Sequence, residues 1–508
     1  MSTHAVPGET VETAPADGSL TRALAHWLAA DSPLRFAMRH LLLAAVFLSF
    51  GLAAAVLLRI ELLTPRLDLM SARTFGALLS LHGGLLFYFV WVPAFPAVLG
   101  YAFLPRLLGA TRLAYPPLMI AAWGLLLFGG VLTVNGFLGG GTDAGWTFDA
   151  RFGGRFTSPG ILAMALGVSA AALALALMGV NLVGTIARGR GATVSASALP
   201  TLVALLCAGL TAVVAGIELA CCALLVAVDG LLGVAIFDPA RGGDPLLFKA
   251  LSRFAFSAAQ SVMLLTGLGV VIAVIRERTR PHAGADRPLG FAVSIAVSAL
   301  AGLAAWPATE ADPVRSQLSQ QLHFGVYAVA ATATMSALVR SVAMLRHGVP
   351  RIDTALVYAL AFLTTMTVML CTGAVLTLPG LGTLLGSTTF ATAHFHVTAM
   401  ALAMAFLAGL HDAWPRLARR RFSESLGIAA ALVLVAGTCL TFLPLFVLGV
   451  AGASFRANSY PPEFQVLQVL STGGMTVLLA AFVLAVLNLV AGRRTGVRVS
   501  GLAPLDGA

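Results

Sequence analysis

Twelve long apolar runs, separated by shorter polar stretches, dominate the chain. They lie at residues 40–58, 75–104, 116–138, 159–187, 198–228, 247–275, 288–307, 322–345, 354–378, 388–413, 425–450 and 465–491. An α-helix needs about 20 apolar residues to cross the hydrocarbon core of a bilayer, and these runs have that length. The pattern therefore predicts an all-α integral membrane protein with twelve transmembrane helices in one bundle, within a single domain at 32–492.

The two ends of the chain differ from the runs between them. Residues 1–31 are polar and rich in alanine without an apolar core, which predicts a disordered tail rather than a cleaved signal. Residues 493–508 form a second short tail. Hydrophobic residues make up 59% of the 508 residues and charged residues only 10%. This composition excludes an ordinary soluble protein and agrees with many membrane spans.

The distribution of the formal net charge of +10 decides between two kinds of partner. Basic chains often bind nucleic acid, but here the arginines lie in short loops between apolar runs. Loops after even-numbered runs are rich in arginine, such as Arg106 and Arg278, whereas loops after odd-numbered runs contain acids such as Asp149 and Glu310. By the positive-inside rule this alternation predicts a lipid-embedded protein with both termini in the cytoplasm and no nucleic-acid partner.

Three histidines lie inside apolar runs, where an ionisable side chain indicates a functional site. His394 and His396 are two positions apart, so on a helix they point about 200° apart and cannot share one metal. His82 is followed by two glycines, which let a bulky planar group approach the helix. Imidazole is a good axial ligand of haem iron, so a helix between two cofactors fits this arrangement. The alternative is core histidines that are hydrogen-bonded to adjacent helices.

Several short motifs occur in a fixed order along the chain. They are Arg59 and Glu61 at the end of the first run, His82 and Gly83 in the second, Gly145 and Trp146 after the third, Gly242 to Pro245 before the sixth, His394 to His396 in the tenth, and Tyr460 to Phe464 before the last. With this ordered set the sequence resembles subunit I of the haem–copper oxidases, the cytochrome c oxidase type, over most of its length. Twelve helices is also the count of that family.

The resemblance implies two haems. His82 and His396 would be the two axial ligands of a low-spin haem, and His394 would be the proximal ligand of a second, high-spin haem. The family also implies partners, namely other membrane subunits of an oxidase-like complex and cytochrome c or a redox subunit as electron donor. Its location would be a bacterial-type inner membrane.

Three further residues match positions around the haems of this family. Arg59 matches the residue that hydrogen-bonds the formyl group of haem A, which suggests this haem type. Trp146 and Arg456 match positions near haem propionates.

The resemblance fails where the family binds copper. Ungapped alignment puts Ser257 at the first copper-ligating histidine and Ser261 at the tyrosine of the active site. Ala308 and Thr309 stand where the other two histidines would be. An arginine, Arg112, occupies the place of the acid that opens one proton path. We therefore expect a member that keeps the haem ligands but has no copper centre and no proton pumping.

Two classes of function follow from this pattern. The first is respiratory-type electron transfer through the low-spin haem to the high-spin haem, which in the relatives ends in the reduction of oxygen to water. Because the residues of oxygen chemistry are missing, the sequence assigns no catalytic residue and leaves enzymatic activity open. The second class is a role without turnover, either haem-based gas binding or sensing, or a structural paralogue in another membrane complex.

Overall fold

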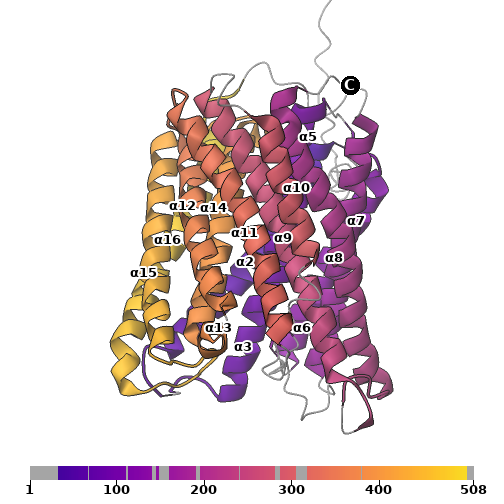
Figure 1. The fold of residues 1–508 in the computed structure, drawn as a ribbon, viewed down its shortest axis with the longest axis vertical. Helices are drawn as coiled ribbons and strands as arrows, with labels where there is room; N and C mark the ends of the chain where they lie inside the picture. Colours follow the sequence, from indigo (N-terminus) through magenta and orange to yellow (C-terminus); the bar gives the residue numbers. More distant parts are fainter. Residues whose placement is uncertain are drawn as a thin grey trace, which may run out of the picture.

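Long α-helices run side by side along the longest axis of the molecule (Figure 1). The computed structural model describes residues 32–66, 68–109, 112–139, 145–147, 159–189, 195–238, 241–280, 287–304, 317–378 and 380–499. The long helices are α2 (Pro33–Glu61), α6 (Pro116–Leu138), α7 (Pro159–Arg188), α8 (Leu199–Leu232), α9 (Pro245–Thr279), α10 (Pro288–Ala304), α11 (Gln317–Arg346), α12 (Thr354–Thr377), α14 (Thr389–Ala418), α15 (Glu424–Val450) and α16 (Gln465–Thr495).

The prediction of an all-α membrane bundle is confirmed. Eleven helical stretches of the described part are long and apolar enough to cross a membrane. The remaining predicted run, 288–307, corresponds to α10, which is apolar but only 17 residues long as far as the described residues reach. It ends at Ala304, and residues 305–316 lie outside the described part.

The second predicted span is not one regular α-helix. It consists of α3 (Ala72–Gly84), the π-helix η1 (Leu85–Trp91), α4 (Val92–Ala94), the π-helix η2 (Phe95–Gly100) and α5 (Tyr101–Leu108). Pro93 and Pro96 lie inside it. A proline lacks the backbone N–H and clashes with the carbonyl four residues earlier, and wider turns are one way in which a helix continues past it. The first π-helix begins at Leu85, three residues after His82.

Helix α14 lies inside the bundle and connects its parts. It packs against α9, α12 and α15, and also against η2 and α2. Its middle section, from Met400 to Ala408, is almost continuously buried. A helix with neighbours on several sides can present different residues to different cavities, which is the arrangement that the two histidines near its start require.

The beginning and the end of the membrane domain are tied together at one end of the bundle. Tyr460 donates a hydrogen bond from its backbone N–H to the carbonyl oxygen of Pro65 (3.0 Å) and one from its hydroxyl to that of Leu62 (2.9 Å). Gln465 donates from its amide to the carbonyl oxygen of Leu63 (3.2 Å). The loop before α16 is therefore held against the loop after α2.

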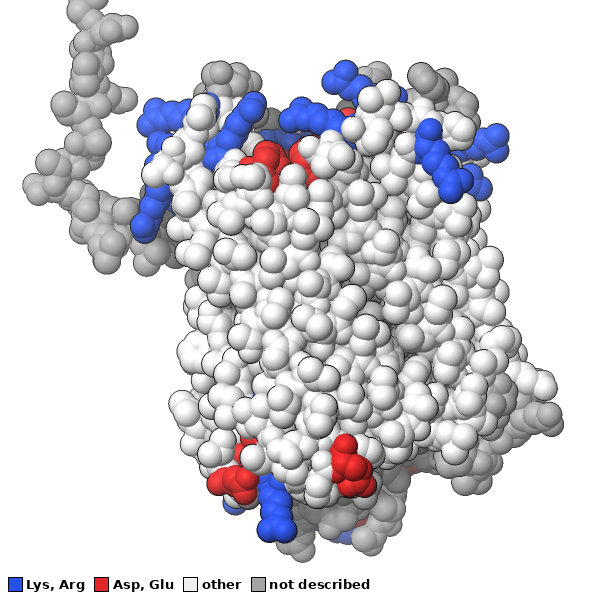
Figure 2. Space-filling view, turned by 90° about the vertical axis from the view of Figure 1, so that its left-hand side faces the viewer, with Lys and Arg blue, Asp and Glu red and all other residues white. Residues whose placement is uncertain are grey.

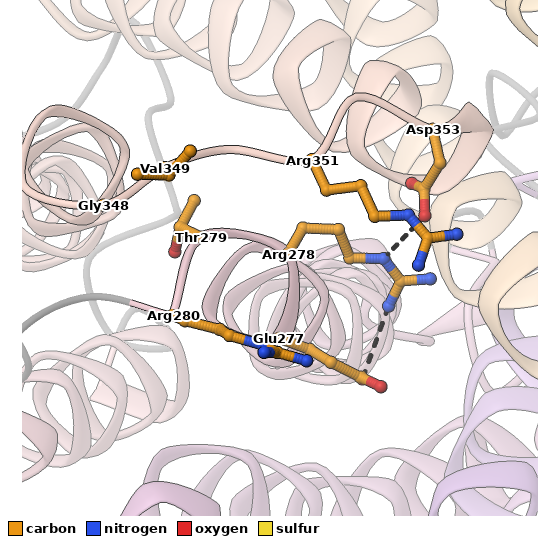
Figure 3. A pocket seen from close by; sticks show the side chains of 8 residues that line it. All are labelled: Glu277, Arg278, Thr279, Arg280, Gly348, Val349, Arg351 and Asp353. Atoms are coloured by element: carbon orange, nitrogen blue, oxygen red, sulfur yellow. Dashed lines mark hydrogen bonds and ion pairs between the residues drawn. The ribbon is translucent and has the colours of Figure 1, made fainter.

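Charged side chains are confined to the two ends of the face drawn in Figure 2, and the wall between them is uncharged. At the arginine-rich end, the carboxylate of Asp412 is only 2% exposed and pairs with Arg106 (3.2 Å), Arg278 and Arg416 (3.2 Å). Arg278 also pairs with Asp353 at 3.0 Å (Figure 3). Buried charges need such partners, so this cluster fixes the ends of α9, α12 and α14 relative to one another.

Candidate functional site

A cavity of about 680 Å³ lies between α2, α3, α14, α15 and α16, and we call it the large cavity. Most of its lining is apolar, and its few polar groups converge from distant parts of the chain. Five of the six residues that the resemblance assigns to the haems line it, namely Arg59, His82, Trp146, His396 and Arg456. This volume and this mixture of groups are typical of a cofactor site.

His82 and His396 face each other across this cavity. Their ring centroids are 6.2 Å apart, and the ring planes differ by only 9°. A metal–nitrogen bond of about 2 Å on each side would separate two opposed imidazole centres by roughly 6 Å. The pair therefore has the spacing of two axial ligands of one metal ion.

Each of the two rings is oriented by a backbone carbonyl. Nδ1 of His82 donates to the carbonyl oxygen of Gly51 (3.0 Å), and Nδ1 of His396 donates to that of Thr392 (2.8 Å). Because a carbonyl oxygen can only accept, Nδ1 carries the proton in both rings and Nε2 keeps its lone pair. Histidine ligands of metals are commonly fixed in this way by an outer hydrogen bond.

A planar ring of the protein itself lies against the glycine after His82. A Cβ atom at Gly83 would lie 2.3 Å from Cδ1 of Trp146, and Gly83 also lines the large cavity. The indole packs among Phe87, Phe256 and Phe395 at centroid distances of 5.3 to 5.5 Å. Trp146 thereby closes one side of the large cavity.

Arg59 enters the cavity wall from the end of α2. Its guanidinium donates to the side-chain oxygen of Gln468 (3.0 Å), to the carbonyl oxygen of Gln468 (2.7 Å) and to the hydroxyl of Thr472 (2.9 Å). Nε of Arg59 is buried and has no hydrogen-bond partner within the described ranges. A cationic donor is thus kept in place by α16, with one N–H left for another acceptor.

Arg456 lies on the loop that Tyr460 ties down. It adopts a positive φ of 59°, and its guanidinium donates to the hydroxyl of Thr147 (3.2 Å). A Cβ atom at Gly145, which has a φ of 74°, would lie 3.2 Å from Nη1 of Arg456. Glycine at position 145 therefore suits both the backbone conformation and the close approach of the arginine.

His394 lies on another face of α14. It lines neither the large cavity nor a second, smaller cavity, which is described below. Its Nδ1 is 2.9 Å from the hydroxyl of Thr372 on α12. This hydroxyl can donate to the carbonyl oxygen of Val368 (3.0 Å) while it accepts from the imidazole. As in the two other histidines, Nδ1 is the hydrogen-bonded atom of the ring, and Nε2 is free to act as a ligand.

A second cavity of about 220 Å³, the small cavity, lies between α9, α10, α11 and α14. Its lining includes Ser257, Ser261, His323, Tyr327 and Thr398, and the last of these donates its hydroxyl proton to the carbonyl oxygen of His394 (2.8 Å). Gln260 lines both cavities, so the wall between them is one side chain thick there.

Tyr327 was not among the residues singled out from the sequence. It lies four residues after His323, on the same face of α11, and that spacing was the available signal. Its hydroxyl donates to the carbonyl oxygen of Leu370 (2.7 Å), and a Cβ atom at Gly373 would lie between this hydroxyl (2.3 Å) and Cε1 of His394 (3.2 Å).

The structure describes two of the four residues that are predicted to stand in place of the copper ligands and the tyrosine. Ser257 and Ser261 line the small cavity, whereas Ala308 and Thr309 lie outside the described residues. In the part of the chain that the structure describes, no three histidine, cysteine or acidic side chains come together as a metal site of their own.

Comparison with known proteins identifies the family. The model of the family described as cytochrome c and quinol oxidase polypeptide I matches residues 35–482. The chain belongs to this family.

Two relatives show how far this chain has diverged in sequence from other members of the family. It is 27% identical over 460 residues to cytochrome c oxidase subunit 1 of Synechocystis sp., covering 89% of this chain and 82% of the relative. It is 25% identical over 467 residues to cytochrome c oxidase subunit 1 of Bacillus subtilis, covering 89% of this chain and 72% of the relative. The predicted resemblance to cytochrome c oxidase subunit I is confirmed.

The fold of this chain also matches a solved structure of a haem–copper terminal oxidase dimer. The TM-score is 0.74 at 15% sequence identity, and the match covers 93% of this chain and 86% of that one. At this identity the match establishes the fold alone.

Proposed function

We propose that this chain holds a low-spin haem in the large cavity, with Nε2 of His82 and Nε2 of His396 as the axial ligands. The observation that carries the proposal is the pair of nearly parallel rings at 6.2 Å, each with Nδ1 bound to a carbonyl. A haem bound there would supply one-electron redox chemistry. Arg59 and Arg456 would bind its polar substituents, and Trp146 would exclude water from one side.

Absorption spectra of histidine variants test this assignment. His82→Ala and His396→Ala should each remove the low-spin absorption bands of the purified protein. The matched control is His411→Ala, because His411 lies on the same helix, is 1% exposed and donates from Nδ1 to the carbonyl oxygen of Leu407 at 2.8 Å, just as His396 does to Thr392. Unchanged spectra in both site variants, or the same loss in the control, would refute the assignment.

We further propose that Nε2 of His394 would hold a second, high-spin haem. The hydroxyl groups of Ser257 and Ser261 are poor copper ligands, so we propose that no copper binds in the small cavity. Elemental analysis of the purified protein should give two iron atoms per chain and almost no copper. Carbon monoxide should still alter the spectrum through the haem on His394. One copper per chain would contradict the proposal.

The resulting function is electron transfer within a membrane complex of the oxidase type. Electrons from cytochrome c or a redox subunit would reach the haem between His82 and His396 and then the haem on His394, which lies on the same helix. Rapid reduction of the purified complex by reduced cytochrome c, with little oxygen consumption and no proton pumping, is the expected result.

A second candidate function is gas binding or sensing without turnover. The observation in its favour is the small cavity, which is lined by hydroxyl groups and lies next to Thr398, one turn from His394. This function would show as binding of carbon monoxide or nitric oxide without any reduction by cytochrome c.

We further propose twelve spans in a bacterial-type inner membrane, with both termini in the cytoplasm. Twelve spans count α10 together with the eleven longer helical stretches, and the gathering of arginines at one end supports the orientation. Reporter fusions after Arg280 and after Asp149 should report opposite sides of the membrane. The same side for both fusions would refute this topology.

A further inference from the structure

Glu218 is a carboxylic acid deep inside the span of α8. The helix continues for 14 residues beyond it to Leu232, and 19 residues precede it from Leu199. At 1.5 Å per residue the nearer end of the helix is about 20 Å away. The hydrocarbon core of a bilayer is about 30 Å thick, so a core centred on this 34-residue helix would have Glu218 close to its midplane.

The carboxyl group of Glu218 is half-buried, and no described residue forms a hydrogen bond or ion pair with it. The other acid of the same helix behaves differently, because Asp229 is 7% exposed and accepts a hydrogen bond from the backbone N–H of Ile236 at 2.9 Å. A carboxyl group inside a membrane is costly and usually faces a partner. Lipid chains offer no donor, so the partner of Glu218 has to be another protein group.

A stripe of exposed apolar side chains runs along α8 beside Glu218. Its members are separated alternately by four and three residues, and we call it the α8 stripe: Leu210, Val214, Ile217, Cys221 and Leu224. Alternating steps of four and three bring residues onto one line when two helices cross at a small angle, which is the usual geometry of packed transmembrane helices.

We propose that the α8 stripe and Glu218 dock a transmembrane helix of another subunit, and that a side chain of this helix donates a hydrogen bond to the Glu218 carboxyl group. The proposal rests on the proposed membership in a multisubunit complex, which the name of the relatives, subunit 1, also implies. A second copy of this chain fits less well. A symmetric contact would satisfy two opposed Glu218 carboxyls only if they were protonated and paired with each other, and the stripe itself offers only the weak donor of Cys221.

Carbodiimide labelling tests the proposal, because dicyclohexylcarbodiimide modifies protonated carboxyl groups that are accessible from lipid. The full chain purified alone and the native complex are each reconstituted into phosphatidylcholine vesicles, labelled and digested, and the Glu218 peptide is quantified by mass spectrometry. Label should appear on Glu218 in the chain alone and be largely lost in the complex. Asp229 is the internal control, since its existing hydrogen bond should keep it unlabelled in both samples.

Three variants separate the hydrogen bond from the apolar contact. Glu218→Gln keeps an acceptor and should retain the partner subunit, whereas Glu218→Leu and Ile217→Trp should release it when the complex is purified. Leu443→Trp is the matched control, because Leu443 is also exposed to lipid (59%) but lies on α15. The low-spin absorption should remain in all four variants, which separates failure of docking from failure of the haem assignment.

Three results would overturn the proposal. Equal labelling in the chain alone and in the complex would show that no subunit covers Glu218. Absence of label from the chain alone would show that its own residues cover the carboxyl group. Protection that appears in a homodimer of the chain would assign the α8 stripe to a second copy instead.

Discussion

Neutralising Asp412 should destabilise the protein far more than neutralising its neighbour Glu277, although the two acids share two arginine partners. Asp412 is 2% exposed and contacts these two, Arg106 and Arg278, and also Arg416. Glu277 is 54% exposed and contacts Arg106 and Arg278 at 2.5 and 3.3 Å. The two variants Asp412→Asn and Glu277→Gln therefore differ in the burial of the charge that is lost and in the additional ion pair with Arg416, which only Asp412 forms.

The magnitude follows from that burial. Removing one partner of a buried ion pair costs about 3–5 kcal/mol, because the remaining charge is left uncompensated. The arginines around Asp412 are 14 to 27% exposed, and Arg106 and Arg278 keep a second acid, so we expect the lower end, about 3 kcal/mol. An exposed pair contributes about 1 kcal/mol or less, which is the limit for Glu277→Gln. A difference of about 2 kcal/mol corresponds to roughly a 30-fold difference in the unfolding equilibrium.

Unfolding in mixed micelles with increasing fractions of sodium dodecyl sulfate, followed by circular dichroism, measures this difference. The effect of Glu277→Gln should vanish at high salt, which screens exposed charges, whereas the effect of Asp412→Asn should persist. Equal destabilisation by the two variants, or loss of both effects at high salt, would show that the buried carboxylate does not hold this end of the bundle together.

Two further predictions concern α16 and His394. A Cβ atom at Gly474 would lie 2.4 Å from the backbone of Leu440, whereas nothing lies within 4 Å at Gly473. In the same micelle assay, Gly474→Ala should therefore destabilise the protein by about 1–3 kcal/mol, whereas Gly473→Ala should stabilise it by about 0.5–1 kcal/mol. The reverse order of stabilities would contradict the packing of α15 on α16. Thr372→Val should weaken haem binding at His394 by about 10- to 100-fold, as measured by carbon monoxide difference spectra. Thr372→Ser should bind haem almost as tightly as the original protein. Equal affinities of the two variants would show that the hydroxyl does not orient the ring.

The helix boundaries could be predicted where the sequence carries an explicit signal. The run 116–138 coincides with α6, because a proline opens it and a glycine follows it. The run 388–413 was too short by five residues, because α14 continues through Pro415 to Ala418. Hydrophobicity alone cannot show whether a helix passes a proline, and the π-helical turns around Pro93 and Pro96 were missed for the same reason.

The candidate site could be predicted in its residues but not in its contacts. His82, His396 and Arg59 belong to motifs that can be recognised along the chain, and all three line one cavity. The partner that holds Arg59 is Gln468, which lies 409 residues away, and no local pattern specifies such a pair. His411 is bound to its own helix in the same way as His396, and each of the two lines a cavity. Only the neighbouring helices show that His396, and not His411, faces a second histidine, His82.

The hydrogen bonds between Tyr460 and the loop after α2 have a consequence for biogenesis. The wall of the large cavity combines His82, from the second span to be synthesised, with Gln468 from the last. While the chain is being inserted into the membrane, the early helices carry their half of this wall without the later half. The cavity is complete only when α16 has been inserted and its loop has docked on Leu62 and Pro65. We therefore expect the proposed haem to be loaded late, after translation, because a chain that stops before α16 leaves the site open on one side.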